Sequence, residues 1–312
     1  MPRKIIIDTD PGQDDAVAML MAFASPELEV LGVVAVAGNV PLSRTVLNAR
    51  KILELAGRTD IPLYAGCARP IRKPLATAEH VHGPSGLDGP SLPEPTVAVQ
   101  DGHGVDFLID AFRAAEAGEI TLVTLGPLTN VAMALIKAPD IAAKVKEIVM
   151  IFGSFSEAGN ITPAADFNNY VDPEASEVVL KSGIPLVMLP MDVTHQCLST
   201  RERLERIRAL GNRCAVATAE MLTFSEHFDI QKYGWDGAPL HDPCAIAYLL
   251  KPELFSGRLV NVEVETASPL TVGMSVVDWW HVTDRPRNAQ FMRFVDVPAF
   301  YELLTERLAR LP

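Results

Sequence analysis

The stretch Ile5-Ile6-Ile7-Asp8-Thr9-Asp10-Pro11-Gly12-Gln13-Asp14-Asp15-Ala16 places four carboxylates directly after a short β-branched apolar run. The apolar run predicts a buried strand, Pro11-Gly12 predicts a turn, and the apolar residues Ala16 to Ala24 predict a helix. Asp14 and Asp15 therefore lie at the beginning of that helix, where the unpaired N–H groups supply only ~0.5 of an elementary positive charge. A hard cation with oxygen ligands, Ca²⁺ or Mg²⁺, would neutralise the remaining negative charge.

Each of these carboxylates, taken alone, has an ordinary structural explanation. Asp8 could end the strand, and Asp14 could cap the helix. One helix end needs only one cap, however, and neighbouring carboxylates repel each other. The cluster as a whole therefore favours a cation site over a purely structural role.

The composition limits the class of protein and the partners to be expected. The chain has 312 residues, of which 48% are hydrophobic, and we expect one domain over residues 1–312 with a large core. The net charge of -12, from 27 Lys+Arg and 39 Asp+Glu, argues against a nucleic-acid or membrane-surface partner and fits a small neutral substrate. No apolar run is long enough to span a bilayer. Cysteines without CxxC spacing and an N-terminus without a signal-peptide pattern predict a cytoplasmic protein.

Strand-like and helix-like segments alternate through most of the chain. The alternation continues from the strand Leu28 to Val36 and the helix Leu42 to Ala56 as far as the strand Ile184 to Asp192. Later segments, between residues 258 and 295, alternate like antiparallel strands. The pattern predicts an α/β fold with a mainly parallel central sheet, helices on both faces and some antiparallel strands toward the C-terminus.

Polar motifs follow several of the predicted strands at the points where those strands end. Asp10, Asn39, Leu125, the loop 153–169 and the approach to His241 all have this placement. Because ligands bind at the carboxyl ends of strands in such sheets, we expect these groups to converge although they are far apart in sequence. Irregular structure is expected at residues 67–100, 153–172 and 229–239.

In this order and at this spacing the motifs resemble those of the inosine-uridine-type nucleoside hydrolases, enzymes that cleave the N-glycosidic bond of ribonucleosides. The resemblance covers nearly the whole chain and is most specific at residues 8–16. It implies a Rossmann-like nucleoside hydrolase fold and a homotetramer. Its other motifs are Gly38-Asn39, His82-Gly83, Gly126-Pro127-Leu128-Thr129-Asn130, Gly159-Asn160, Phe167-Asn168, Val171-Asp172-Pro173-Glu174-Ala175 and His241-Asp242-Pro243.

The resemblance implies a Ca²⁺ site. Asp10, Asp15, Asp242 and the main-chain carbonyl of Leu125 would be its protein ligands, and water with the ribose 2′- and 3′-hydroxyls would complete the shell. With Asp15 bidentate, these groups supply about eight oxygens, a number that Ca²⁺ accepts and Mg²⁺ does not.

The resemblance also implies which residues bind the sugar. Asp14, Asn39 and Asn168 would bind the ribose hydroxyls, and Asn160 with the residue at position 166 would bind the 5′-hydroxyl. This sequence has Asp166 where the family usually has Glu, so the contact with the 5′-hydroxyl is in question.

Three further residues are expected at the base or on the pocket wall. His82 lies in a proline-rich segment and is expected to contact the base, which the sequence leaves unidentified. Phe152 and Phe167 each adjoin a polar motif and are expected to line the pocket. Phe152 stands where family members often have Gly, so it is expected to narrow the pocket near the sugar or base.

Cleavage of the bond between C1′ and the base leaves an oxocarbenium-like sugar, which carboxylates around the ring would stabilise. Asp10 is the candidate base that activates a water held by the metal. His241 resembles the family's leaving-group acid, and the unperturbed histidine pKa of ~6.5 suits proton donation near neutrality. The alternative for His241 is a helix cap next to Asp242 and Pro243.

Two other functions fit parts of the sequence. A haloacid-dehalogenase-type phosphatase also has an apolar strand followed by Asp-x-Asp, with the first aspartate, here Asp8, as nucleophile; that family's threonine is here Gly12. A nucleoside- or ribose-binding protein that has lost catalysis is the other alternative, and Asp166 motivates it.

Overall fold

β1 (Arg3–Thr9) is an interior strand of a nine-stranded sheet in the computed structural model, which describes residues 1–312. It pairs in parallel with β2 (Leu28–Ala35) on one side and with β4 (Ile120–Thr124) on the other. Its three isoleucines are fully buried. A β-branched run that is buried on both faces is typical of an interior parallel strand, and β1 has this position in the sheet.

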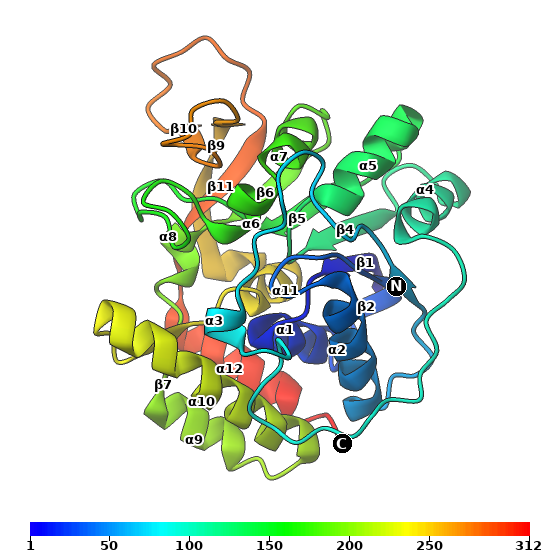
Figure 1. Ribbon diagram of the computed structural model, residues 1–312, viewed down its shortest axis with the longest axis vertical. Coiled ribbons are helices and arrows are strands. Elements are labelled where there is room, and N and C mark those ends of the chain that lie inside the picture. Colours follow the sequence, from blue (N-terminus) through cyan, green and yellow to red (C-terminus); the bar gives the residue numbers. More distant parts are fainter.

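The strand order is β10-β9-β11-β6-β5-β4-β1-β2-β3 (Figure 1). All neighbours from β3 to β11 pair in parallel, β9 runs antiparallel to β11, and β10 runs antiparallel to β9. The predicted α/β fold with a mainly parallel sheet is confirmed. The strands not yet bounded are β3 (Leu63–Ala65), β5 (Glu147–Ile151), β6 (Leu186–Leu189), β9 (Phe255–Val264), β10 (Ser275–Asp278) and β11 (Ala289–Val295).

Helices cover both faces of the sheet, as the alternation predicts. One face packs against α1 (Gln13–Phe23), α2 (Leu42–Leu55), α10 (Arg213–Tyr233), α11 (Pro243–Leu250) and α12 (Val297–Leu308) in a cluster of 51 buried residues. The other face packs against α4 (Gly104–Ala114), α5 (Thr129–Lys137) and α7 (Pro173–Leu180) in a cluster of 30 buried residues. None of the helices is both long and apolar enough to cross a bilayer.

Short elements occupy the segments between these helices and strands. They are α3 (Glu79–His82), α6 (Phe167–Val171), α8 (Met191–Thr194), α9 (Arg201–Arg208), and the strands β7 (Leu198–Thr200) and β8 (Gly237–Pro239), which pair with each other. The 3₁₀ turns Pro139–Ala143 and Pro252–Leu254 complete the list.

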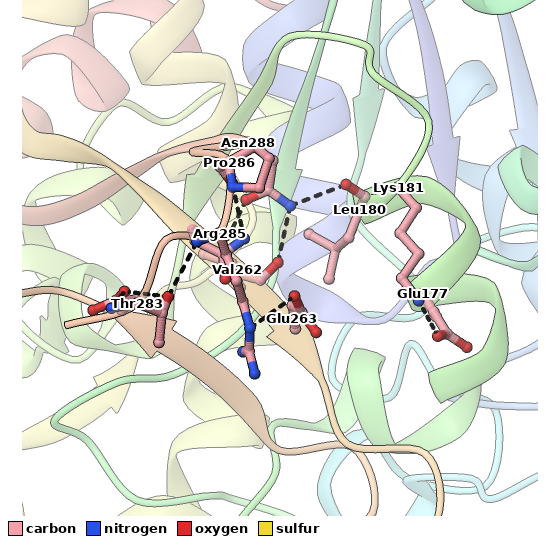
Figure 2. A network of polar contacts seen from close by, with 11 residues as sticks. Glu177, Leu180, Lys181, Val262, Glu263, Thr283, Arg285, Pro286 and Asn288 are labelled. Atoms are coloured by element: carbon pink, nitrogen blue, oxygen red, sulfur yellow. Dashed lines mark hydrogen bonds and ion pairs between the residues drawn. The ribbon is translucent and has the colours of Figure 1, made fainter. Parts of the chain in front are cut away.

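Asn288, directly before β11, ties the antiparallel strand β9 to helix α7 (Figure 2). Its Nδ2 donates to the carbonyl of Leu180 at 3.0 Å and to that of Val262 at 2.9 Å, and its Oδ1 accepts from the Val262 N–H at 2.8 Å. An ion pair between Arg285 and Glu263 at 3.5 Å lies beside them. One side chain thus joins the end of α7 to β9.

Two predicted boundaries in the second half of the chain are wrong. The predicted loop 229–239 is helical at first, because α10 continues through Tyr233 and ends at Gly234, whose φ of 68° is the left-handed conformation that ends many helices. The predicted strand Ile184 to Asp192 ends at Leu189, since Pro190 and helix α8 follow. Both corrections place additional helical residues beside the carboxyl ends of the strands.

Candidate active site

The order of the strands creates a crevice at the ends of β1 and β4. The chain adds β2 and β3 on one side of β1 and then β4, β5 and β6 on the other. Loops that leave β1 and β4 therefore diverge, and this topological switch point is where open α/β sheets bind their ligands. Asp10 follows β1, and Leu125 follows β4.

Asp10 lies between two glycines at the ends of neighbouring strands. A Cβ atom at Gly38 would lie 2.0 Å from its Oδ2, and one at Gly126 would lie 2.2 Å from its Oδ1. The main-chain N–H of Asn39 donates to Oδ2 at 2.8 Å. Residues with a side chain would displace the carboxylate, so its position requires glycine at both places.

Asp15 is surrounded by hydrogen-bond donors. Its oxygens accept from Thr9 Oγ1 at 2.5 Å, from the main-chain N–H of Gly12 at 2.9 Å, and from Asn39 Nδ2 at 3.1 Å. The bond from Gly12 caps α1, because Gly12 is the residue before that helix. Asn39 also donates from Nδ2 to the main-chain carbonyl of Asp10 at 3.2 Å and so joins the two acidic positions.

Asp14, Asp15 and Asp242 form a carboxylate cluster, with ligand oxygens within 4.8 Å of one another. Burial, followed by the charge of Asp15, raises the pKa of Asp14 to about 7. Burial and the charges of the neighbouring aspartates raise the pKa of Asp242 well above its usual range. None of these aspartates forms an ion pair with a lysine or arginine.

Asp10 lies beside this cluster and interacts with it through its charge. Burial, followed by the charge of Asp15, raises the pKa of Asp10 well above its usual value. Buried carboxylates that raise one another's pKa values and have no positive partner suit a hard cation, which prefers carboxylate and carbonyl oxygens. The nearby carbonyl of Leu125 accepts a hydrogen bond from Asn168 Nδ2 at 2.7 Å and keeps a second lone pair.

A cavity of about 140 Å³ opens beside the cluster. Asp10 and Asp15 are buried and contact Asn39, which lines it. The sequence-predicted site residues are therefore brought together. Those on the wall are Asp14, Asn39, His82, Leu125, Phe152, Asn160, Asp166, Phe167, Asn168, His241 and Asp242.

Asn160 and Asp166 differ in what their side chains can offer a ligand. The Oδ1 atom of Asn160 is buried without a hydrogen-bond partner, and its main-chain carbonyl accepts from Lys232 at 2.8 Å. Both oxygens of Asp166 accept main-chain N–H groups, from Gly153 and from Asn169. Asn160 is therefore the freer of the two acceptors.

His241 is held by Thr194, whose Oγ1 lies 2.7 Å from Nδ1. Burial, followed by the nearby His195 and His82, lowers the pKa of His241 to about 3. Burial also lowers the pKa of His82, to about 4. Both imidazoles are therefore neutral near pH 7, in contrast to the unperturbed pKa that the sequence suggests for His241.

The sequence indicates that residues 229–239 help to discriminate between bases, but it does not place Phe228 or Tyr233 around the ligand. One face of α10 lines the cavity with Phe228, Asp229, Lys232 and Tyr233. These residues share a face because the helix continues through residues 229–233. Gly234 is a typical helix-ending residue, and this signal in the sequence could have shown that the helix extends through residues 229–233. His195 was also missed; its ring lies 5.9 Å from that of His241 between centroids, and only the fold brings the two together.

The phosphatase alternative is excluded by the position of Asp8. The side chain is fully buried, and its Oδ2 accepts from Asn130 Nδ2 at 2.8 Å. A nucleophile has to reach its substrate, and Asp8 lies within the sheet.

Comparison with known proteins agrees with this site. The family model described as inosine-uridine preferring nucleoside hydrolase matches residues 5–302. An uncharacterized protein of Schizosaccharomyces pombe is 56% identical over 309 residues, 99% of this chain and 100% of that protein. The pyrimidine-specific ribonucleoside hydrolase RihA of Photobacterium profundum is 48% identical, with 99% of each chain covered.

Solved structures with a similar fold are also nucleoside hydrolases. A plant nucleoside hydrolase superposes with a TM-score of 0.93 at 33% identity over 99% of each chain. The purine-preferring ribonucleoside hydrolase from Gardnerella vaginalis superposes with a TM-score of 0.92 at 30% identity over 98% of each chain. The fold and site define an enzyme that hydrolyses the N-glycosidic bond of ribonucleosides. The chain belongs to the inosine-uridine preferring nucleoside hydrolase family.

Proposed function

We propose that this enzyme is a Ca²⁺-dependent ribonucleoside hydrolase that prefers pyrimidine nucleosides and releases free base and ribose for salvage. The observation that carries the Ca²⁺ dependence is the group of buried aspartates without a cationic partner beside the cavity. The pyrimidine preference is supported by relatives at 47–48% identity that are named pyrimidine-specific. A homotetramer in the cytoplasm, as the sequence suggests, belongs to the same proposal.

The donor set fits Ca²⁺. Asp10, Asp15, Asp242 and the carbonyl of Leu125 would hold the ion, and Asp14 lies close enough to join them or to bind a ribose hydroxyl. A bound Ca²⁺ would keep the carboxylates ionised and would position water and the ribose 2′- and 3′-hydroxyls.

Asp10 is the general base of the proposed reaction. One of its oxygens accepts the Asn39 N–H, and the glycines on both sides leave the carboxylate the space that it occupies. A base held in one position can take a proton from the attacking water without reorganisation, and such positioning contributes much of the rate in enzymes. The surrounding carboxylates stabilise the positive charge that develops on the sugar.

His241 assists departure of the base as a neutral donor. The Thr194 hydroxyl has no other acceptor in the structure, so we assign its proton to the hydrogen bond with Nδ1 of His241. Nε2 then carries the imidazole proton and can donate to the base as negative charge develops there. The imidazolium form is not needed for this step.

Different residues of the cavity are proposed to contact the hydroxyls of the sugar and the apolar faces of the substrate. Asn39, Asn168 and Asp14 are the proposed ribose contacts, and Asn160 is the proposed contact for the 5′-hydroxyl. Asp166 is proposed to act beside it mainly by holding the loop. Phe152 and Phe167 supply apolar surface, which favours a planar base or the face of the sugar over bulk water.

A nucleoside panel tests this proposal. The purified enzyme is incubated with uridine, cytidine, inosine and adenosine, after chelation and after addition of Ca²⁺ or Mg²⁺, and free base and ribose are measured. We expect release that needs Ca²⁺ and is fastest with uridine or cytidine. Faster release from purine nucleosides would contradict the base preference, and binding without release would favour the ligand-binding alternative.

A further inference from the structure

Gln13 connects the first turn of α1 to the short helix α3. Its Nε2 donates to the main-chain carbonyl of His82 at 3.0 Å and to that of Asp88 at 3.2 Å. Its Oε1 forms a hydrogen bond with Nδ1 of the His82 imidazole. Gln13 is only 1% exposed, so these bonds are made away from solvent.

The two carbonyls determine which way the amide of Gln13 points. A main-chain carbonyl oxygen accepts and cannot donate, so the amide nitrogen must lie on the side of His82 O and Asp88 O. The reversed amide would place its oxygen against two other oxygens. Oε1 therefore faces Nδ1 of His82, and since an amide oxygen only accepts, Nδ1 carries the proton.

The orientation of the His82 ring is fixed as well. A Cβ atom at Gly12 would lie 2.6 Å from Nδ1 and 2.8 Å from Cε1 of the ring, so the imidazole packs directly on the turn before α1. His82 lines the cavity, and Nδ1 is the ring nitrogen that bonds to the protein. In a neutral imidazole with the proton on Nδ1, the remaining nitrogen is an acceptor.

We propose that Gln13 is a positioning residue that fixes the tautomer of His82, so that Nε2 presents a hydrogen-bond acceptor to the substrate. The inference rests on the proposed function, because the group that meets Nε2 is then an N–H or NH₂ of the pyrimidine base. His241 presents the opposite group, a donor, because Thr194 occupies its Nδ1. One acceptor and one donor match the edge of a neutral pyrimidine, which carries both kinds of group.

Two substitutions separate the tautomer from the loop contacts. Gln13→Glu and Gln13→Met both remove the donor that binds the carbonyls of His82 and Asp88, but only glutamate keeps an acceptor for Nδ1. In enzyme labelled with ¹⁵N-histidine, NMR should show His82 protonated on Nδ1 in the wild type and in Gln13→Glu. In Gln13→Met the proton should move to Nε2. This readout does not depend on turnover, so it stands whether or not the proposed substrate class is right.

Kinetics then test whether Gln13 acts through His82. With uridine, Gln13→Met should lower kcat/KM about tenfold, the size expected for one lost hydrogen bond. In a His82→Ala background the same substitution should have little further effect, because coupled residues are not additive. A proton on Nε2 of His82 in the wild type would overturn the inference. So would a full Gln13→Met effect in the His82→Ala background, since that result would assign Gln13 to the loop alone.

Discussion

Asp166 accepts a hydrogen bond at 3.0 Å from the main-chain N–H of Gly153, so one carboxylate joins the segment after β5 to the start of α6. Its second oxygen accepts from Asn169 at 3.2 Å and caps α6. The sequence predicts a shortened ligand for the 5′-hydroxyl at this position. The geometry supplies another reason for aspartate, because a helix cap needs a short side chain.

Asp166→Glu should therefore reduce both stability and activity. The added methylene moves the carboxylate away from the N–H groups of Gly153 and Asn169 in a site that is only 5% exposed. Loss of a cap lowers the free energy of unfolding by about 1 kcal/mol, which urea unfolding measures. A rise in kcat/KM with uridine, and none with 5′-deoxyuridine, would show instead that the family's longer side chain reaches the 5′-hydroxyl.

Asp166 also predicts a pH dependence of stability. Burial raises its pKa from 3.8 to about 6, so between these values the folded protein keeps a proton that the unfolded chain has lost. This residue therefore lowers the free energy of unfolding as pH rises from about 4 to about 6. In Asp166→Asn the free energy of unfolding should fall less steeply with pH in this range, by up to about 1.4 kcal/mol per pH unit. Equal slopes in urea titrations of both proteins would contradict this.

Asp10→Asn tests the general base. The amide keeps the size of the side chain and one ligand oxygen but cannot take a proton, so turnover should fall by about 10²–10⁴ while substrate still binds. Initial rates with uridine give the loss, and calorimetry with Ca²⁺ shows whether the ion still binds. Retention of more than about a tenth of the activity would assign the base to another residue.

His241→Ala should affect substrates according to their leaving groups. Uracil and hypoxanthine need a hydrogen-bond donor in order to depart, whereas p-nitrophenolate departs unaided. Cleavage of uridine or inosine should therefore suffer far more than cleavage of p-nitrophenyl riboside. If both kinds of substrate lost the same factor, His241 would act through binding or structure.

Gly126→Ala should displace Asp10, because the three atoms nearest to the new Cβ atom all belong to Asp10. This Cβ atom would lie 2.2 Å from Oδ1 of Asp10, so the carboxylate has to rotate or move. We expect weaker Ca²⁺ binding and a loss of turnover comparable to that of Asp10→Asn. Gly183→Ala is the control, since a Cβ atom there meets nothing within 4 Å and only strains a backbone with φ of 78°. Unchanged Ca²⁺ affinity in Gly126→Ala would show that Asp10 can relax.

The parts of the site that lie at strand ends could be predicted from the sequence. Asp10, Asn39 and Leu125 each follow a recognisable apolar strand, and parallel strands bring their carboxyl ends to one edge. The beginning of α1 was less predictable. The helix starts at Gln13 instead of Ala16, because Gly12 and Asp15 form its cap while Asp15 also belongs to the acidic cluster.

The contacts between distant segments could not be predicted. Thr194 and His241 are 47 residues apart, and Gln13 and His82 are 69 apart, so no local periodicity relates them. The same is true of α10, which brings Leu222 and Ser225 as well as side chains beyond residue 228 to a cavity formed by distant segments. Such pairs depend on tertiary packing, which overrides local pattern.

The acidic cluster joins the first helix of the chain, α1, to the start of α11, and this separation has a consequence during synthesis. Asp14 and Asp15 leave the ribosome early, whereas Asp242 follows after more than two hundred further residues. Until then no complete site exists, and each emerging carboxylate is solvated on its own. Ca²⁺ would therefore bind only the finished chain, so ion binding would stabilise the folded product by mass action without guiding its early folding steps.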